Sequence, residues 1–89
     1  MTDFSALIKQ LQKAKGSSNE LDIACEIAMF EPDGTYSSVR ANSAGTKVIY
    51  TKTDGTEETH WAQDWSMARP STITLLRHRV IDIAARAGN

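Results

Sequence analysis

The sequence predicts an α+β domain in which three helices pack against a three-stranded antiparallel meander, in the order helix, helix, three strands, helix. Apolar residues recur at helical spacing in the first third of the chain and again near its C-terminal end. Residues 47–61 are instead rich in β-branched residues and are divided by Asp54-Gly55, a typical hairpin pair. The 89 residues are expected to form a single domain, 1–89. The sequence does not decide whether helices cover both faces of the sheet, as in an α/β/α sandwich.

The first third of the chain is predicted to form two helices, over residues 3–15 and 17–30. In the first helix the apolar side chains lie on one stripe: Phe4, Leu7, Ile8 and Leu11. The second helix is predicted to begin with a capping box, in which the Ser17 hydroxyl accepts the Glu20 N–H and the Glu20 side chain returns the bond.

The second predicted helix is apolar around most of its circumference, so we expect it to be largely buried. Only Asp22 and Glu26, one turn apart, are expected to face solvent. Cys25 has these acids as neighbours and lacks the nearby positive charge that activates a thiol, so we expect a small core residue. It is the single cysteine, which excludes an intrachain disulfide and favours a reducing compartment.

Three strands are predicted in the middle of the chain, over residues 35–40, 47–53 and 56–61. Pro32 ends the second helix, because the residue before a proline is disfavoured in helical conformation. The first two strands are expected to pair through a turn over residues 42–45. The last two are expected to pair through Asp54-Gly55, with the positive φ angles of a type I′ turn at both positions.

The last segment is predicted to be a helix with Pro70 in its first turn. Either Ser66 or Ser71 is expected to cap it, and the sequence does not choose between them. The predicted buried stripe contains Ile73, Leu76, Val80, Ile83, Ala84 and Ala87, and is widened by Leu75 and Ile81.

Parts of both ends of the chain are similar to a known family. The matching segments are Gly16-Ser-Ser-Asn-Glu-Leu-Asp22, Tyr36-Ser-Ser38, and Ala68-Arg-Pro-Ser-Thr-Ile-Thr-Leu-Leu76 running into Ile83-Ala-Ala-Arg86. They resemble the bacteriophage ABA sandwich domain family, and the chain departs from that pattern at Arg69, where the family prefers threonine. The resemblance implies an α/β/α sandwich of phage or prophage origin with no established activity. It carries no functional residue over to this chain.

No catalytic, cofactor-binding or metal-binding motif is evident, so we expect no enzyme, cofactor or metal. Glu58 and His60 share a strand face and have the side chains of metal ligands, but a solvated edge strand explains the pair as well. Glu57 and Glu58 point to opposite faces of a strand and cannot act together on one substrate. His78, placed between two arginines, is expected to lie on a solvated helix face.

Charge alternates in sign along the chain, although the formal net charge is only −1. The hairpin region contains four acids and no lysine or arginine: Asp54, Glu57, Glu58 and Asp64. The last segment contains four arginines against one acid, namely Arg69, Arg77, Arg79 and Arg86 against Asp82. The acidic residues could contact a basic protein, and the arginines could contact phosphates. The alternative is that both sets form ordinary solvated surfaces.

Trp61 and Trp65 are predicted to share one face of a continued strand, four residues apart. Tryptophan fills small cores economically and is also enriched in binding hot spots. We expect Trp61 in the core and leave Trp65 open between core and surface. An exposed Trp65 beside Met67 would indicate a protein-binding patch.

The acidic hairpin and the tryptophans predict a non-enzymatic protein that binds another protein. With the phage or prophage origin that the resemblance implies, the partner would be a host or phage protein, for example a host defence or regulatory complex that is inhibited. The expected contact residues are Asp54, Glu57, Glu58, Asp64, Trp65 and Met67. The alternative is an accessory protein that binds nucleic acid or a nucleotide through Arg69, Arg77 and Arg86. No apolar run approaches the roughly 20 residues of a membrane helix, so we expect no membrane partner. The lone cysteine favours a reducing compartment, and with the phage resemblance this implies a cytoplasmic protein in the host bacterium. The sequence does not indicate an oligomeric state.

Overall fold

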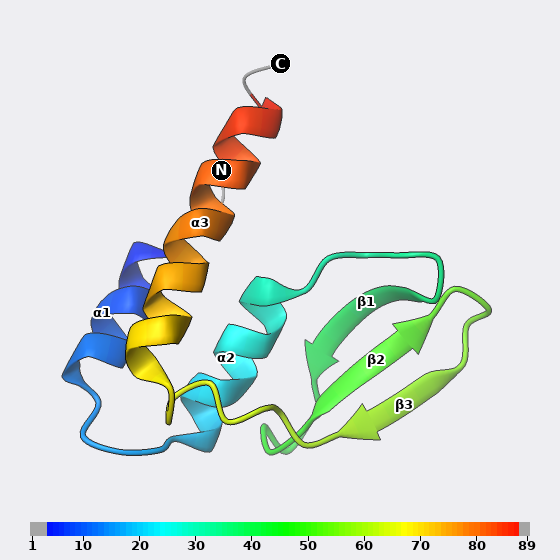
Figure 1. The fold of residues 1–89 in the computed structure, drawn as a ribbon. Helices are drawn as coiled ribbons and strands as arrows, with labels where there is room; N and C mark the ends of the chain where they lie inside the picture. Colours follow the sequence, from blue (N-terminus) through cyan, green and yellow to red (C-terminus); the bar gives the residue numbers. More distant parts are fainter. Residues whose placement is uncertain (1–3, 88–89) are drawn as a thin grey trace.

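The computed structural model describes residues 4–87, and the side chains of residues 4–81 (Figure 1). The elements are α1 (Ser5–Lys13), α2 (Asn19–Met29), β1 (Tyr36–Ala41), β2 (Val48–Lys52), β3 (Glu57–His60) and α3 (Arg69–Ala87). The strands form one antiparallel sheet in the order β1-β2-β3. The α+β class and the predicted element order are therefore confirmed.

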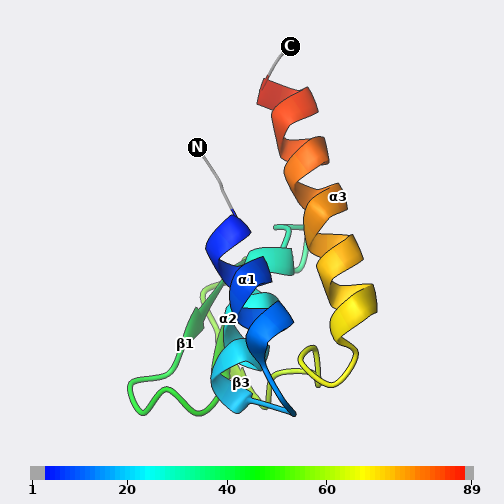
Figure 2. The ribbon, with the colours of Figure 1, turned by 90° about the vertical axis from the view of Figure 1, so that its left-hand side faces the viewer.

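The three helices lie together on one side of the sheet (Figures 1 and 2). Helix α2 contacts β1, whereas α1 and α3 pack against α2 and against each other. The described helices thus do not form the two outer layers of an α/β/α sandwich. None of the described helices is long and apolar enough to cross a bilayer.

The helices share a core of three fully buried side chains, Leu11 of α1, Cys25 of α2 and Leu76 of α3. Partly buried side chains surround this core: Phe4, Leu7, Ile8, Leu21, Ala28, Met29, Trp65 and Ile73. The stripe predicted for the first helix is therefore confirmed. The predicted start of that helix at Asp3 lies outside the described residues.

Helix α2 begins one residue later than the predicted capping box. Ser18, not Ser17, is the N-cap, and its hydroxyl accepts the N–H of Leu21 at 3.3 Å. The backbone N–H of Ser18 donates to the hydroxyl of Ser66 at 2.8 Å. This long-range bond fixes the start of the helix, and local sequence could not reveal it.

The predicted solvent-facing strip of α2 is wrong. Asp22 and Glu26 are only 5% and 7% exposed, as buried as the apolar Ile23 beside them. The backbone N–H of Ser66 donates to Asp22 at 2.7 Å, and other donors reach Glu26 from the same returning segment. These side chains are buried because a distant segment supplies the hydrogen bonds that buried carboxylates need.

The two turns of the sheet depend on side-chain acceptors and glycines. In the first turn the carbonyl oxygen of the Asn42 side chain accepts the N–H groups of Thr46 and Lys47 at 2.8 and 3.1 Å. In the second turn Gly55 has φ of 91°, but no described non-glycine residue has positive φ, so the predicted type I′ turn is wrong. The N–H of Gly55 instead donates to the carbonyl of Lys52 at 3.0 Å, giving a three-residue loop that ends in a left-handed glycine.

Helix α3 begins at Arg69, and neither candidate serine is its cap. Ser71 lies inside the helix, and the Ser66 hydroxyl is bonded to the Ser18 backbone. The predicted widening of the buried stripe is wrong, because Leu75 and Ile81 are 44% and 63% exposed. The side chains of Ile83, Ala84 and Ala87 lie outside the described set.

Replacing Cys25 with serine is expected to lower the free energy of unfolding by about 1–3 kcal/mol, because a hydroxyl then has to be buried. The thiol is fully buried, and burial, together with the charge of Asp22, raises its pKa to about 11. Urea denaturation followed by circular dichroism measures the effect, with Cys25→Ala as the control. A serine variant at least as stable as the alanine variant would contradict the burial of this position.

Candidate aromatic cleft

An open cleft of about 420 Å³ lies between α2 and the sheet. Six residues line it, and we call it the aromatic cleft: Glu26, Tyr36, Tyr50, His60, Trp61 and Gln63. They come from α2, from all three strands and from the segment after β3. The sheet pairing and the returning segment create this site, which no local sequence pattern contains.

Strand alternation places the rings of the cleft on the sheet face that is turned toward α2. Val48, Tyr50 and Lys52 share that face of β2, and register sets His60 opposite Val48 and Glu58 opposite Tyr50. The centroids of Tyr36 and Tyr50 are 5.4 Å apart with their planes at 63°, and those of Tyr50 and His60 are 5.9 Å apart at 64°. The rings therefore stand edge to face, an arrangement that aromatic pairs favour.

Glu26 holds the inner end of the cleft together. Its Oε2 accepts the hydroxyl of Tyr50, and its Oε1 accepts the indole N–H of Trp65 at 2.6 Å and the backbone N–H of Gln63 at 3.3 Å. All three donors are neutral, and no lysine or arginine within residues 4–81 forms an ion pair with Glu26. Glu26, a residue that is only 7% exposed, thus has hydrogen bonds to its carboxylate but no ion-pair partner among the described side chains.

The two tyrosines of the cleft donate to carboxylates and stay protonated. Burial first, and then the bond to Glu26, raises the pKa of Tyr50. The hydroxyl of Tyr36 donates to Oε1 of Glu58 at 3.0 Å, and this bond is the main reason that its pKa is raised. Neither phenol suits proton abstraction at neutral pH. Both phenols therefore act in the cleft as hydrogen-bond donors.

Glu58 of β3 contacts a side chain of each strand beside the cleft. Its carboxylate lies 2.9 Å from Nζ of Lys52 and 3.3 Å from Nε2 of His60, and it also accepts the hydroxyl of Tyr36. These contacts, that with Lys52 above all, lower its pKa to about 2. Within the described residues no group of three or more His, Cys, Asp or Glu side chains is placed to hold a metal ion. Glu58 and His60 share a strand face, as predicted, but Lys52 and Tyr36 also contact the Glu58 carboxylate.

The Glu58 contacts are expected to make stability depend on pH in the acid range. A pKa lowered from the ordinary 4.5 to about 2 means that the unfolded chain binds the proton more tightly than the folded one. The contribution of Glu58 is then complete above about pH 4.5 and is lost as the pH falls toward about 2. Urea midpoints measured across this range are expected to fall less steeply for Glu58→Gln than for the wild type. Equal slopes would contradict this reading, and Asp33 and Asp54, whose pKa values are also lowered, account for the slope that remains.

The two tryptophans do not share a strand face as predicted, because β3 ends at His60. Trp61 is 67% exposed at the rim of the cleft, so the prediction that it is a core residue is wrong. Nζ of Lys47 lies 4.7 Å from the centroid of its ring. Trp65 is half-buried against the helical core and gives its N–H to Glu26, while Met67 nearby is 67% exposed.

The acidic residues of the hairpin are divided between the two faces of the sheet, as expected for Glu57 and Glu58. Glu57 lies 2.8 Å from Arg40 on the face turned away from α2, whereas Glu58 pairs with Lys52 on the other face. Asp54 accepts the N–H and hydroxyl of Thr56 at 2.9 and 2.6 Å and so shapes the turn. Much of the acidic surface predicted from the sequence is therefore engaged within the molecule.

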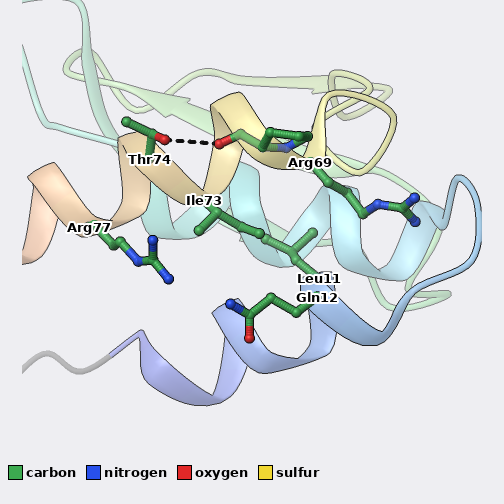
Figure 3. A pocket seen from close by; sticks show the side chains of 7 residues that line it. Leu11, Gln12, Arg69, Ile73, Thr74 and Arg77 are labelled. Atoms are coloured by element: carbon green, nitrogen blue, oxygen red, sulfur yellow. Dashed lines mark hydrogen bonds between the residues drawn. The ribbon is translucent and has the colours of Figure 1, made fainter.

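Two of the predicted phosphate-binding arginines line a groove of about 490 Å³ between α1 and α3. In Figure 3 Arg69 extends away from Arg77, and Leu11, Gln12 and Ile73 lie between them. A guanidinium N–H of Arg69 donates to the carbonyl of Ala14 at the end of α1. The two guanidiniums therefore do not converge on one anion, and the side chain of Arg86 lies beyond the described range.

No family model, curated protein or solved structure matches this chain. Sequence reasoning assigned no binding role to Glu26, Tyr36, Tyr50 or Gln63. The one sequence feature that could have indicated Glu26 is the pair of acids Asp22 and Glu26 on an otherwise apolar helix. This pattern fits buried carboxylates as well as a solvent-exposed strip.

Proposed function

We propose that this protein is a non-enzymatic binding protein whose contact surface centres on the aromatic cleft and whose partner is another protein. The observation that carries the proposal is Trp61, which is 67% exposed at the rim of the cleft. Tryptophan is enriched in binding hot spots. When a partner covers an exposed indole, the apolar surface of the ring is removed from water, which favours binding.

The surface around Trp61 extends beyond the aromatic cleft. A second hollow, of about 220 Å³, is lined in part by Gln63, Asp64, Trp65 and Leu75. Gln63 lines both hollows, so the surface continues from Trp61 toward α3. Met67 and Leu75 add exposed apolar area along the same segment and the start of α3. Three residues expected from the sequence to contact a partner, Asp64, Trp65 and Met67, thus lie on the segment beside the cleft.

The biological setting that we propose rests on the sequence resemblance to phage ABA sandwich domains alone, because the described helices lie on one side of the sheet and do not share the sandwich layering. A protein made by a phage or prophage would use the surface to bind a host or phage protein, and inhibition of a host defence or regulatory complex is one form of that action. Contact with nucleic acid through Arg69 and Arg77 is less well supported, because the two side chains do not converge and Arg69 is bonded to Ala14.

Photo-crosslinking tests the proposed surface. A benzophenone amino acid at Met67, which is 67% exposed on the segment beside the cleft and leaves Trp61 in place, is expected to give discrete protein adducts in bacterial lysate. The same group at His78, an exposed position on α3, is expected not to. Excess wild-type protein should compete for the adducts, and excess Trp61→Ala protein should compete poorly. Equal adducts from both positions, or adducts that are removed by nuclease and by moderate salt, would contradict the proposal.

A further inference from the structure

We infer that the aromatic cleft binds a methylated ammonium group, as found in a trimethyl-lysine side chain or in free choline. This inference rests on the proposed function, because it names the ligand chemistry of the same site. Its three supports are the rings of the cleft, the charge at its inner end and the ammonium group that the protein itself places over Trp61.

The first support is the ring composition. Tyr36, Tyr50, His60 and Trp61 all line the cleft, and the described pairs stand edge to face rather than stacked flat on one another. Tyr36, Tyr50 and His60 thus pack on one another as a group of rings at the cleft, and Trp61 stands exposed at its rim. The faces of tyrosine and tryptophan attract cations. The volume of about 420 Å³ lies within the roughly 300–1,000 Å³ of small-ligand sites.

The second support is the charge at the inner end of the cleft. Glu26 is nearly buried and no basic side chain within residues 4–81 is ion-paired with it, whereas buried carboxylates are usually paired. A cation in the cleft would offset this uncompensated charge. An anion is disfavoured, since the hydroxyls of Tyr36 and Tyr50 already donate to Glu58 and Glu26.

The third support is the position of Lys47. Its Nζ lies 4.7 Å from the centroid of the Trp61 ring, so this ring already receives an ammonium group from the protein itself. An alkylated ammonium loses less hydration than a primary one when it enters an aromatic site, and quaternary ammonium ligands are typical of such sites. Lys47 is therefore expected to compete with the ligand for the face of Trp61.

The test is a titration of the ¹⁵N-labelled full chain followed by NMR, with choline, a trimethyl-lysine peptide, the same peptide with unmodified lysine, and 3,3-dimethylbutanol, the uncharged counterpart of choline. We expect saturable shifts at Trp61 and its neighbours with the methylated cations. The alcohol and the unmodified peptide are expected to bind at least tenfold more weakly. Tighter binding of the peptide than of choline assigns the ligand to a protein, and the reverse assigns it to a small molecule.

Variants distinguish specific binding of a methylated cation in the cleft from non-specific binding. Trp61→Ala is expected to weaken choline binding at least tenfold, and Glu26→Gln, which removes charge and keeps shape, to weaken it severalfold. Lys47→Ala is expected to tighten it severalfold, and His78→Ala, on the far helix, to leave it unchanged. Amide spectra of each variant confirm that it is folded before it is titrated.

The inference fails if the alcohol binds as well as choline, or if a folded Trp61→Ala protein binds choline as the wild type does. It also fails if no methylated cation shifts the cleft resonances. In each of these cases the proposed function stands if position 67 still crosslinks specifically to a protein. Conversely, choline binding without specific crosslinks would overturn the protein partner and support the cation site.

Discussion

Replacing Glu26 with alanine is expected to lower the free energy of unfolding by about 3–5 kcal/mol, out of the roughly 5–15 kcal/mol that stabilises a typical domain. The carboxylate accepts three hydrogen bonds, from the hydroxyl of Tyr50, the indole of Trp65 and the backbone of Gln63. A donor left unsatisfied in a buried position costs about 1–3 kcal/mol. Water entering through the cleft and relief of the buried charge reduce the total, which is why the expected loss is less than three full penalties.

Two variants serve as controls for this substitution. Glu26→Gln keeps an acceptor for Trp65, and its amide can donate to the oxygen of Tyr50, so it is expected to cost less than half as much as alanine. Glu20→Ala removes an exposed carboxylate from the same helix and is expected to cost under about 1 kcal/mol. Urea denaturation followed by circular dichroism gives all three values. If Glu26→Ala were no more damaging than Glu20→Ala, Glu26 would not hold the sheet and the returning segment together.

Local sequence was sufficient for the elements of this fold, because each one carries its own signal. The spacing of Phe4, Leu7, Ile8 and Leu11 fits an α-helix, and the β-branched run over residues 47–53 fits a β-strand. Gly55 does adopt the positive φ that its turn requires, although the loop is one residue longer than predicted. Periodicity and turn chemistry act over a few residues and can therefore be read without knowing the tertiary structure.

The candidate site could not be predicted from local sequence, because its contacts join distant parts of the chain. Glu26 is 24 residues from Tyr50 and 39 from Trp65, and each of these contacts reverses an expectation based on local polarity. A carboxylate on an apolar helix is normally exposed, and here it is buried because a later segment brings donors to it. The prediction that Trp61 is a core residue failed for the opposite reason. Strand β3 ends at His60, one residue before Trp61, and this apolar side chain is exposed.

Replacing Leu76 with alanine is expected to lower the free energy of unfolding by about 2–5 kcal/mol, the usual cost of removing a leucine from a fully packed site. Leu76 is fully buried among Leu11 and Cys25, and it anchors α3 to the other two helices. Leu75, the next residue along α3, is 44% exposed, and Leu75→Ala is expected to cost under about 1 kcal/mol. The pair therefore compares the same chemical change on the buried and the solvent side of one helix.

Amide hydrogen exchange adds a readout that depends on the architecture. The helical core contains no strand residue, and Val48, the fully buried residue of β2, lies outside it. Loss of the Leu76 side chain is therefore expected to speed exchange in α3 and α1 more than in β2. If Leu76→Ala instead accelerated exchange uniformly, the helices and the sheet would unfold as one unit, and the bond between Glu26 of α2 and Tyr50 of β2 would be among the contacts that couple them. Equal stabilities of the Leu76→Ala and Leu75→Ala proteins would contradict the packing of α3 itself.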